Sequence, residues 1–424
     1  MDNRSMIQQG LDYIEENLQT DIAAAELAEM AHISLFHYYR LFQQATGLPV
    51  MQYILRRRLL HGVYAIREGS SKIDAALRFG FDTYAGFYRA FCREFGSTPS
   101  AFLASCRAKR PYRIDITKEE HMTVTHKKAA RILENWNLSD AVITDIYYDS
   151  TGNRNENACY VGEAYVLKYT ANPGKLKKHI EVSRALENIG LLAAVPVPTT
   201  GGADYIQDGE VYFYLTRRLP GKQMVSQNFG AGDGRFVGEI IGQLHLALAK
   251  IDDCVSEADL LSTLRDWALP KAQAAMNLPD AFCKEFLKTF TELYPGLPRQ
   301  IIHRDPNPGN IICAGDRWGF IDFELAERNV RIYDPCYAAT AVLSESFGDD
   351  NGPWLEVYRD IICGYDSVAK LTESERRAIP CIILANQFVC VAWFSEQDKY
   401  AEIFETNKRM TAWLIEKFGE LSDI

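Results

Sequence analysis

The N-terminal part of the chain contains an internal repeat, and this repeat limits the possible folds more than any other feature. The same pattern of residues recurs at an offset of 49 between residues 5 and 106. The matched pairs are Tyr38 and Phe87, Tyr39 and Tyr88, Arg40 and Arg89, Phe42 and Phe91, Gly47 and Gly96, and Tyr53 and Phe102. A fixed period indicates copies of one structural unit, so we expect two similar helical units in tandem.

Each copy predicts two helices joined by a tight turn. The short first helices are expected at residues 24–31 and 73–79. A capping residue, Ser34 or Asp82, then offers a side-chain oxygen to the free amides at the start of the second helix. The second helix ends at Gly47 or Gly96, because glycine adopts the left-handed conformation of a helix end at little cost. Both copies therefore predict a helix-turn-helix.

Helical spacing divides each second helix into an apolar face and a polar face. Core-facing positions are expected at Tyr38, Leu41, Phe42, Ala45, Phe87, Phe91 and Phe95. The opposite faces carry Phe36, His37, Tyr39, Arg40, Gln43, Thr83, Tyr84, Arg89 and Arg93. These residue types can bind base edges or phosphates in a major groove, and two such units suit successive groove turns about 34 Å apart. A helical bundle that binds no DNA is the alternative.

The two copies resemble the DNA-binding domain of the AraC/XylS family of transcription regulators. The resemblance covers about residues 5–106 and includes the pattern G-F-x(5)-F-x-R-x-F-x(3)-F-G-x-T-P, which runs from Gly80 to Pro99. By that resemblance, the residues that contact double-stranded DNA are Phe36, Tyr39, Arg40, Tyr84, Ala85, Gly86 and Arg89, and the polar faces add His37 and Thr83. Ala85 and Gly86 stand where polar side chains are usual in that family.

Charge is distributed unevenly along the chain. The formal net charge is −10, but residues 40–113 hold 13 Lys and Arg against four Asp and Glu. Residues 117–424 hold 32 Lys and Arg against 44 Asp and Glu. A basic segment on an acidic chain favours a nucleic-acid-binding module joined to a different domain, although a solvated basic face would give the same counts.

Length and cysteine spacing narrow the class of protein further. The 424 residues predict two or three domains. Ten cysteines occur without a C-x-x-C pair, which favours reduced thiols in a cytoplasmic protein over a disulfide framework or a zinc site. The N-terminus lacks a signal-peptide pattern. The longest apolar run, residues 379–394, is interrupted by Asn386 and Gln387, so we expect a buried helix and no membrane partner.

Beyond residue 126 the pattern changes to a mixture of helices and strands. Helices are predicted at 127–138 and 174–190, strands at 142–148, 158–161, 164–170, 203–206 and 211–216, and mostly helices beyond 232. We therefore expect a multidomain protein, in which an all-α double helix-turn-helix domain precedes a two-lobed α+β domain. The predicted boundaries are 1–106 for the first domain, 107–126 for a linker, 127–220 for a small lobe and 221–424 for a large lobe.

The clearest chemistry lies in H-R-D-P-N-P-G-N at 303–310 and G-F-I-D-F at 319–323. The spacing H-R-D-x(4)-N is that of a kinase catalytic loop, and transfer of a γ-phosphoryl group requires an aligned nucleophile and neutralised phosphate charge. Asp305 can accept the proton of an attacking hydroxyl group or orient it. Asn310 and Asp322 can supply oxygen ligands to Mg²⁺. We expect the apolar pairs at 301–302 and 311–312 to form short buried strands that hold the loop.

A lysine and a carboxylate complete the neutralisation of the phosphates. Lys168 lies in the strand-like sequence V-L-K-Y, and Glu181 follows thirteen residues later on the next predicted helix. We predict that Glu181 holds Lys168 against the phosphates of a nucleotide. The alternative is a surface lysine and a surface glutamate without this role.

These motifs resemble the aminoglycoside phosphotransferase and choline kinase superfamily, whose fold is protein-kinase-like. The resemblance covers about residues 130–345, and its motifs lie at 218–221, 241–245, 303–310, 321–324 and 333–335. It implies ATP or GTP with Mg²⁺, and a nucleotide base near residues 216–219. We assign cofactor contacts to Arg217 and Leu219 on that basis, and to Asn157 in a single-glycine segment, 150–157, that replaces the usual glycine-rich loop. Arg304 stands where glycine or alanine is usual.

The sequence as a whole predicts an AraC-type transcription regulator fused to an ATP- and Mg²⁺-dependent small-molecule phosphotransferase. The expected partners are operator DNA, a nucleotide, a small hydroxyl compound that carries an amine, and a second copy in a homodimer. Acidic candidates for a cationic substrate are Glu324, Glu327, Asp349, Asp350 and Glu396. Two alternatives stay open: the kinase-like domain is a ligand sensor without turnover, or the chain is an antibiotic-modifying enzyme with an accessory N-terminal domain.

Overall fold

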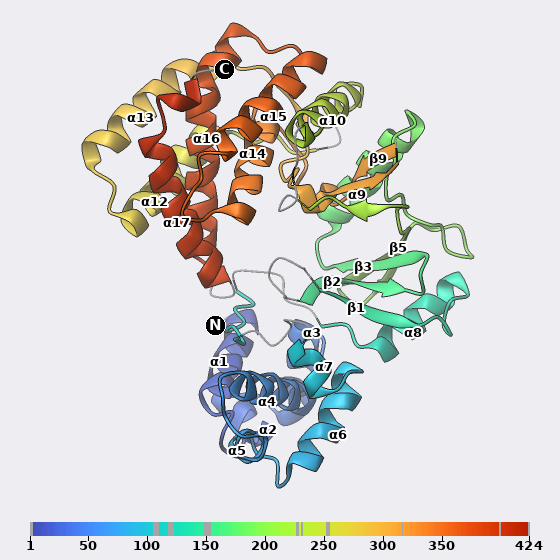
Figure 1. The fold of residues 1–424 in the computed structure, drawn as a ribbon. Coiled ribbons are helices and arrows are strands. Elements are labelled where there is room, and N and C mark those ends of the chain that lie inside the picture. Colours follow the sequence, from blue (N-terminus) through green and yellow to red (C-terminus); the bar gives the residue numbers. More distant parts are fainter. Residues whose placement is uncertain are drawn as a thin grey trace. The chain divides into compact units, whose positions relative to one another are not determined.

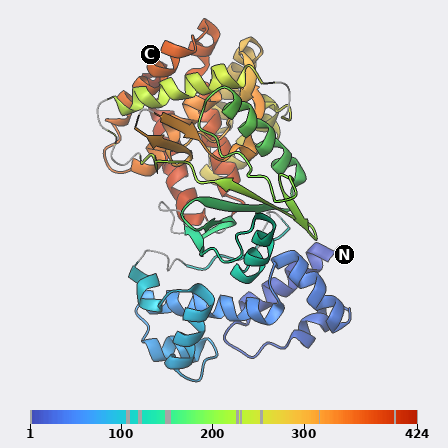
Figure 2. The same cartoon turned by 90° about the vertical axis from the view of Figure 1, so that its right-hand side faces the viewer.

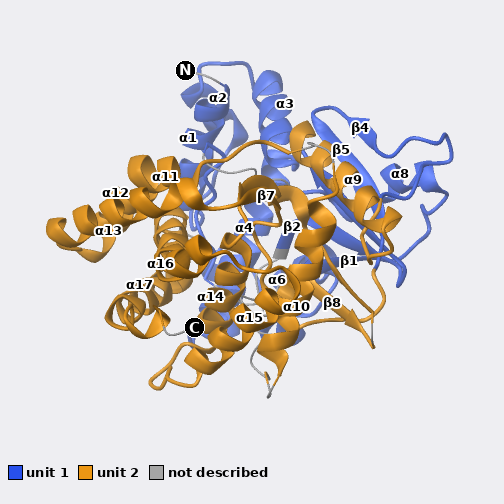
Figure 3. Ribbon diagram, turned by 90° about the horizontal axis from the view of Figure 1, so that it is seen from above, with its two compact units in different colours: residues 1–172, 196–218 blue, residues 173–195, 219–424 orange. Residues whose placement is uncertain are grey.

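A computed structural model describes residues 3–104, 110–117, 123–147, 154–225, 229, 232–251, 255–315, 317–397 and 400–422. The chain forms two compact units (Figure 3). One comprises Met1–Asn172 and Pro196–Arg218, and the other comprises Pro173–Val195 and Leu219–Ile424. The first unit contains the N-terminal helices and a five-stranded sheet, and the second is mostly helical. The expected order of an all-α region followed by an α+β region is confirmed.

The N-terminal region consists of short helices, as the repeat predicts (Figures 1 and 2). They are α1 (Asn3–Glu16), α2 (Ala24–Met30), α3 (Leu35–Thr46), α4 (Val50–Arg67), α5 (Lys72–Arg78), α6 (Tyr84–Phe95) and α7 (Pro99–Ala104). Each repeat contributes one helix pair, α2 with α3 and α5 with α6, and α4 connects them. The second helix of each pair is the expected recognition helix.

The helix ends agree with the predicted caps except at one position. Ser34 caps α3 by accepting a hydrogen bond from the backbone N–H of His37. Gly47 and Gly96 end α3 and α6 in the left-handed conformation, at φ +77° and +61°. The predicted cap at Asp82 is wrong: Thr83 has the extended backbone of a capping residue, and its hydroxyl accepts from the N–H of residue 86 at 3.1 Å. The helix therefore begins one residue later than predicted.

The two repeats bury equivalent aromatic residues in separate cores. Tyr38 and Phe42 lie in the first core, and Phe87 and Phe91 lie in the second, all with no exposed surface. These are the positions that helical spacing assigned to the inner face. The duplicated sequence has thus produced two similarly built helical units.

The segment after α7 packs against the first repeat. Ile114 and Ile116 are buried in the same core as Tyr38. At the end of α3, the backbone N–H of Thr123 donates to the carbonyl of Thr46 at 3.1 Å. Part of the predicted linker, 107–126, therefore belongs to the helical core, whereas residues 107–109 and 118–122 lie outside the described ranges. The domain boundaries themselves remain predictions.

An antiparallel sheet of order β1-β2-β3-β5-β4 completes the first unit. Its elements are the preceding helix α8 (His126–Leu133) and the strands β1 (Ile143–Tyr147), β2 (Arg154–Val161), β3 (Tyr165–Thr170), β4 (Ile206–Asp208) and β5 (Val211–Arg217). The strand predicted at 203–206 is misplaced. Thr199 and Ala203 close a turn through Gly202 at φ +82°, so β4 starts only at Ile206.

The second unit contains α9 and the C-terminal helices. The helices are α9 (Pro173–Asn188), α10 (Asp233–Leu248), α11 (Leu260–Thr263), α12 (Leu269–Met276), α13 (Asp280–Leu293), α14 (Tyr333–Ser346), α15 (Trp354–Val368), α16 (Glu373–Phe394) and α17 (Ala401–Glu416). Short strands lie among them, namely β6 (Lys222–Gln223), β7 (Arg299–Ile302), β8 (Ile311–Ala314), β9 (Arg317–Phe320) and β10 (Glu327–Val330). β8 pairs with β6 and β9, and β7 pairs with β10.

Helices α10 and α15 approach each other more closely than side chains would allow. A Cβ atom on Gly238 would lie 2.0 Å from the carbonyl oxygen of Ile361, and one on Gly364 would lie 2.1 Å from that of Arg235. Only glycine fits at these positions, because the neighbouring backbone cannot yield as a flexible side chain can. This close packing brings the inner faces of the two helices into contact behind the catalytic loop.

Helix α16 contains the predicted apolar run. It is long and apolar enough to cross a membrane by length and composition alone, but 78% of that stretch is buried inside the protein. Asn386 and Gln387 are buried with it. The expected buried helix is confirmed.

Candidate active site and recognition helices

The loop that carries Asp305 lies between two short strands. β7 ends at the fully buried Ile302, and β8 begins at Ile311, directly after a helical turn at Pro308–Asn310. The pairing of β7 with β10 and of β8 with β9 fixes both ends of the loop by backbone hydrogen bonds. The short strands predicted at 301–302 and 311–312 are confirmed.

A buried carboxylate on α14 holds the start of this loop. Asp334 has no exposed surface and accepts hydrogen bonds from the backbone N–H groups of His303, at 2.8 Å, and Arg304, at 3.0 Å. Its Oδ2 atom also accepts from Nε2 of His245 at 2.9 Å. A buried charge is tolerated only when such donors surround it. Asp334 therefore fixes the backbone immediately before Asp305.

The imidazole of His245 is fixed on its other side by α15. The hydroxyl of Tyr365 donates to Nδ1 at 2.8 Å, and burial raises the pKa of Tyr365, so that this hydroxyl keeps its proton. The glycine contacts between α10 and α15 allow the two side chains to meet. His245 is thus a buried histidine with both nitrogens hydrogen-bonded.

The ring of His303 maintains the shape of the loop. Nε2 donates to the carbonyl of Ile321 at 2.9 Å, and Nδ1 accepts the backbone N–H of Asp305 at 3.3 Å. These contacts assign the proton of the neutral ring to Nε2. Because both nitrogens are engaged with backbone groups, His303 orients the loop instead of exchanging protons with a ligand.

Asp305 lies half-buried, and neighbouring side chains orient its carboxylate. Nδ2 of Asn307 donates to Oδ1 at 2.8 Å, and Nδ2 of Asn310 donates to Oδ2 at 3.2 Å. The hydroxyl of Tyr337 on α14 bonds to the same carboxylate. Burial raises the pKa of Asp305, and the charge of Asp322 adds to that rise, while these hydrogen bonds oppose it. An oriented carboxylate with a raised pKa is suited to accepting a proton.

A backbone hydrogen bond joins the segments that carry the two predicted metal ligands. The backbone N–H of Ile321 donates to the carbonyl of Asn310 at 3.0 Å, which joins the end of the loop to the segment that contains Asp322. Asn310 uses its Nδ2 atom for Asp305, so its Oδ1 atom remains the acceptor that a cation would use. Carboxylate and amide oxygens are the ligands that Mg²⁺ prefers. The donor set around Asp305, Asn310 and Asp322 therefore fits a magnesium ion.

Two residues of this site adopt a left-handed backbone without being glycine. Arg304 has φ +78° and Asp322 has φ +74°. The guanidinium of Arg304 pairs with Glu327 at 2.9 Å and lies 4.0 Å from the ring centre of Tyr333. These contacts give the arginine a structural role in the loop. Strain of this kind persists only where the surroundings enforce it.

The predicted nucleotide residues are distributed over both units. Lys168 lies on β3 opposite Tyr214, Asn157 lies on β2, and the exposed Arg217 ends β5. In the second unit, Glu181 lies on α9 and forms an ion pair with Lys177 at 3.7 Å, and Leu219 follows β5 and is half-buried. The pairing of Lys168 with Glu181 remains a prediction. Residues 150–153 of the predicted phosphate loop lie outside the described residues.

The first recognition helix exposes two of its four predicted DNA contacts to solvent. Phe36 is 82% exposed, Arg40 is exposed, and His37 and Tyr39 are half-buried. Tyr39 packs partly against the first core. An aromatic side chain exposed to this degree at a helix start is a candidate for contact with a partner molecule.

The second recognition helix has a smaller set of free side chains. Ala85 and Arg89 are exposed, but the hydroxyl of Thr83 is used as the helix cap. Tyr84 is half-buried and stacks on Phe87 at 5.9 Å. Arg89 is therefore the predicted contact of α6 with the greatest freedom to reach DNA.

The arginines of α4 are engaged within the domain. Arg57 is buried in an ion pair with Glu15, and Arg56 pairs with Glu94 of α6 at 2.8 Å. Arg58 donates to backbone carbonyls in the loop after α1. Part of the positive charge counted from the sequence thus stabilises the two repeats against each other and against α1.

Family comparison assigns the second half of the chain. Residues 147–370 match the profile described as "Phosphotransferase enzyme family". The chain belongs to this family. Residues 27–105 match a helix-turn-helix domain. This phosphotransferase domain therefore follows an AraC-type helix-turn-helix domain in one chain, and both predicted resemblances are confirmed.

Solved structures support the kinase-like fold of this phosphotransferase. A microcompartment-associated aminopropanol kinase aligns over 69% of this chain and 98% of its own, with 15% identity and a TM-score of 0.53. A choline/ethanolamine kinase family protein from Mesorhizobium loti aligns over 70% of this chain and 97% of its own, with 14% identity and a TM-score of 0.50. At such identities the likeness establishes the fold alone, and the predicted protein-kinase-like fold is confirmed.

Curated relatives match a smaller part of the chain. The transcriptional regulator Rob of Salmonella typhimurium is 32% identical over 132 residues, which are 30% of this chain and 46% of that protein. The probable transcriptional regulator LumQ of Photobacterium leiognathi is 33% identical over 92 residues, which are 22% of this chain and 37% of that protein. The phosphotransferase chain thus spans less than half the length of these relatives.

The sequence did not reveal the residues of α14 and α15 that hold the loop around Asp305. Asp334 was noted only as part of a Y-D-P motif, and Tyr337 and Tyr365 were not singled out. The available signal was an aspartate within the otherwise apolar start of α14, because a charge among buried residues requires a specific partner. The partners lie on distant segments, so the motif alone could not name them.

Proposed function

We propose that this protein is a DNA-binding transcription regulator whose second domain transfers the γ-phosphoryl group of ATP or GTP to a small hydroxyl compound. The observation that carries the catalytic part is the oriented carboxylate of Asp305, held by Asn307, Asn310 and Tyr337 beside Asp322. Membership of the phosphotransferase enzyme family supports the reaction class.

In the proposed reaction, the hydroxyl oxygen of the acceptor forms a bond to the γ-phosphorus as the bond to the nucleoside diphosphate breaks. The proton of the hydroxyl group passes to Asp305. Its carboxylate is oriented toward this task by amide donors on both oxygens. Positioning and charge neutralisation supply most of the catalysis in such reactions.

Asn310 and Asp322 would hold Mg²⁺, which neutralises phosphate charge when bound. We assign Lys168, held by Glu181, to the phosphates of the nucleotide. Asn157, Arg217 and Leu219 are assigned to the remaining nucleotide contacts. These assignments rest on the order of the motifs along the chain and on the family resemblance.

An amine-bearing acceptor is the substrate class we favour. Two structural neighbours are described as an aminopropanol kinase and a choline/ethanolamine kinase family protein. Two of the acidic candidates for an amine are already engaged, because Glu327 pairs with Arg304 and Glu396 pairs with Lys271. Asp349 and Asp350 are exposed, and we keep them as candidates together with Glu324.

The enzymatic proposal is tested with the full chain, ATP and Mg²⁺ against a panel of aminopropanol, ethanolamine, choline and aminoglycosides. Transfer of labelled phosphate to an acceptor is expected, and Asp305→Asn should abolish it while nucleotide still raises the melting temperature. Binding of nucleotide and an acceptor by the wild type without transfer would favour the ligand-sensor alternative. Equal transfer by wild type and Asp305→Asn would refute the assigned mechanism.

The DNA-binding proposal is tested on α3 and α6 separately. Arg40→Ala and Arg89→Ala should each weaken binding to a duplex selected from a random-sequence library, by about 1–3 kcal/mol if the arginine contacts a base. Arg78→Ala on the exposed face of α5 is the matched control, since it removes the same charge outside the recognition helices. Equal losses in all three variants would mean that only general charge attraction is at work.

A further inference from the structure

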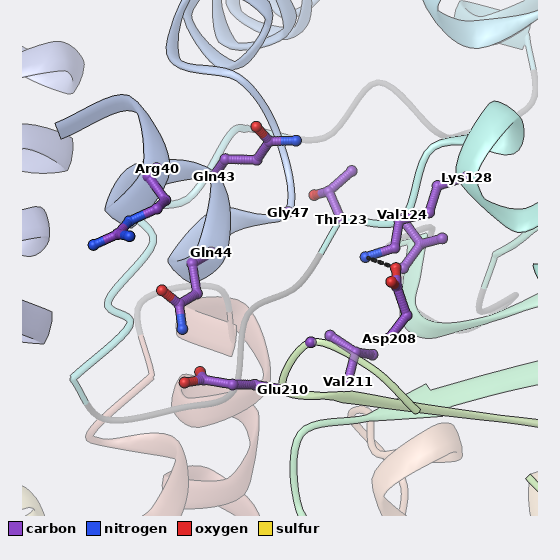
Figure 4. A pocket seen from close by; sticks show the side chains of 11 residues that line it. Arg40, Gln43, Gln44, Gly47, Thr123, Val124, Lys128, Asp208, Glu210 and Val211 are labelled. Carbon is purple, nitrogen blue, oxygen red and sulfur yellow. Dashed lines mark ion pairs between the residues drawn. The ribbon is translucent and has the colours of Figure 1, made fainter. Parts of the chain in front are cut away.

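A pocket of about 260 Å³ separates the first recognition helix from the sheet of the same unit (Figure 4). Arg40, Gln43 and Gln44 of α3 line one side. Residues 208–210, which form the turn between β4 and β5, line the other side together with Lys128 of α8. The polar face of a helix expected to read DNA is therefore opposed by a segment of the kinase-like domain.

A direct backbone contact maintains this arrangement. The N–H of Thr123 bonds to the carbonyl of Thr46 at 3.1 Å, and a Cβ atom on Gly47 would lie 2.2 Å from the carbonyl oxygen of Thr123. Thr125, shortly after this contact, caps α8. The end of α3 is thus in direct backbone contact with the segment that leads into α8.

Near the pocket, one carboxylate is paired with basic side chains and another is not. Lys128 and Arg131 of α8 both pair with Asp208, at 3.1 and 2.9 Å. Glu210 is exposed, and among the described residues no ion pair includes it. In Figure 4 its side chain extends beneath Gln44, on the side of the pocket where Arg40 lies. An uncompensated carboxylate therefore stands close to the polar face of α3.

We infer that the β4–β5 turn, residues 208–210, shields the first recognition helix from DNA. A recognition helix is about 10–12 Å across, and it fills a major groove about 12 Å wide. The groove is flanked by one negative charge for about each 1.7 Å of duplex. The turn and Glu210 stand where those phosphates would pass Arg40 and Gln43. DNA binding by α3 and the docked turn therefore exclude each other.

This shielding rests on the proposed DNA binding and adds a means of regulation to it. The apparent association constant for DNA equals the intrinsic constant multiplied by the fraction of molecules in which the turn has left α3. Any ligand that binds the docked and undocked forms unequally shifts that fraction. In the second repeat, a Cβ atom on Gly96, which is equivalent to Gly47, would meet no atom of the described residues within 4 Å.

The test uses the full chain and a duplex selected on it from a random-sequence library. Glu210→Lys should bind this duplex about tenfold more tightly than the wild type, since it removes the repulsion and weakens docking. Glu163→Lys is the matched control: Glu163 is also exposed and lies in the turn after β2. β3 and β5 are antiparallel, so that turn is at the opposite end of the sheet. The affinity of Glu163→Lys for the duplex should stay within about twofold of the wild-type value.

A charge-neutral variant separates shielding from a new DNA contact. Glu210→Gln should gain part of the increase, whereas a gain by Glu210→Lys alone would mean that the added lysine touches phosphate and would overturn the inference. Equal gains by Glu210→Lys and Glu163→Lys would overturn it as well. Arg89→Ala keeps the two proposals distinct: if it weakens binding while the residue 210 variants change nothing, DNA binding stands and shielding falls. Failure of the wild type and of every variant to retain a duplex would remove both proposals.

Discussion

The carboxylate of Asp334 accepts a hydrogen bond from the backbone N–H of His303 at 2.8 Å, and this contact ties α14 to the catalytic loop. The same carboxylate holds the N–H of Arg304, where the backbone is left-handed. The position of Asp305 therefore depends on Asp334, which has no exposed surface and holds the two preceding residues. The geometry proposed for catalysis therefore depends on buried residues as well as on the loop.

Asp334→Asn should lower the rate of phosphoryl transfer more than it lowers nucleotide binding. Asparagine offers one acceptor oxygen in place of two, and its amide group opposes backbone N–H groups that also donate. We expect kcat to fall by about 10- to 100-fold, with the nucleotide-induced rise in melting temperature retained. Asp360→Asn, on the exposed face of α15, is the control. Full activity of Asp334→Asn would show that the loop does not need this anchor.

The acid limb of kcat/KM should lie above the pH at which an ordinary aspartate titrates, about 4. Burial raises the pKa of Asp305, and the proposed base acts only when deprotonated, so activity rises with pH through that raised pKa. Tyr337→Phe removes a hydrogen bond that lowers this pKa and should move the limb to higher pH. Initial rates measured from acidic to neutral pH would reveal the limb. An unmoved limb in Tyr337→Phe would contradict the assignment.

The acid stability of the N-terminal domain should depend on Glu15. Burial alone would raise its pKa, but hydrogen bonds from His61 and Arg57 lower it to about 2. The unfolded pKa is about 4.3, so this stabilisation is complete above that pH and is lost as the pH falls toward 2. Glu15→Gln should lower the free energy of unfolding by about 3 kcal/mol at pH 7, and the difference from wild type should shrink on acidification.

Denaturant unfolding at pH 7 and in the acid range measures this difference. The control is Glu16→Gln, because Glu16 is 62% exposed and pairs with Arg113 at the surface. We expect its effect to stay below about 1 kcal/mol. A Glu15→Gln deficit that is constant with pH would mean that the carboxylate charge does not contribute.

Gly47→Ala and Gly96→Ala should differ although the two positions are equivalent in the repeat. Both glycines are left-handed, so alanine strains each by about 1–2 kcal/mol. Only at residue 47 would the added carbon meet the carbonyl of Thr123. We expect a larger fall in melting temperature for Gly47→Ala, with faster amide exchange at Thr123. Equal effects of the two substitutions would mean that the contact with Thr123 does not contribute to stability.

Local patterns predicted much of this fold. The repeat located both helix pairs and both glycine ends, because caps and apolar spacing depend on neighbouring residues. Asp82 was misassigned as a cap because Thr83, one position later, satisfies the same requirement. The strand expected at 203–206 was misplaced because a turn through Gly202 occupies its first positions.

The catalytic loop was also recognisable, whereas its supports were not. The spacing of Asp305, Asn310 and Asp322 is local, but Asp334, Tyr337 and His245 reach the loop only after distant helices have packed. The role of Arg304 could not be predicted for the same reason, since its partner Glu327 lies on β10. Contacts between distant segments follow from packing, which no single motif records.

The left-handed backbones at Arg304 and Asp322 have a consequence for attempts to make this protein more robust. A library screened only for heat resistance should favour glycine at residue 322, because glycine adopts that conformation without penalty. Such variants would lack a carboxylate beside Asp305. At residue 304 the same gain would be offset by the loss of the contacts with Glu327 and Tyr333. Heat resistance and turnover would then be selected in opposite directions at residue 322.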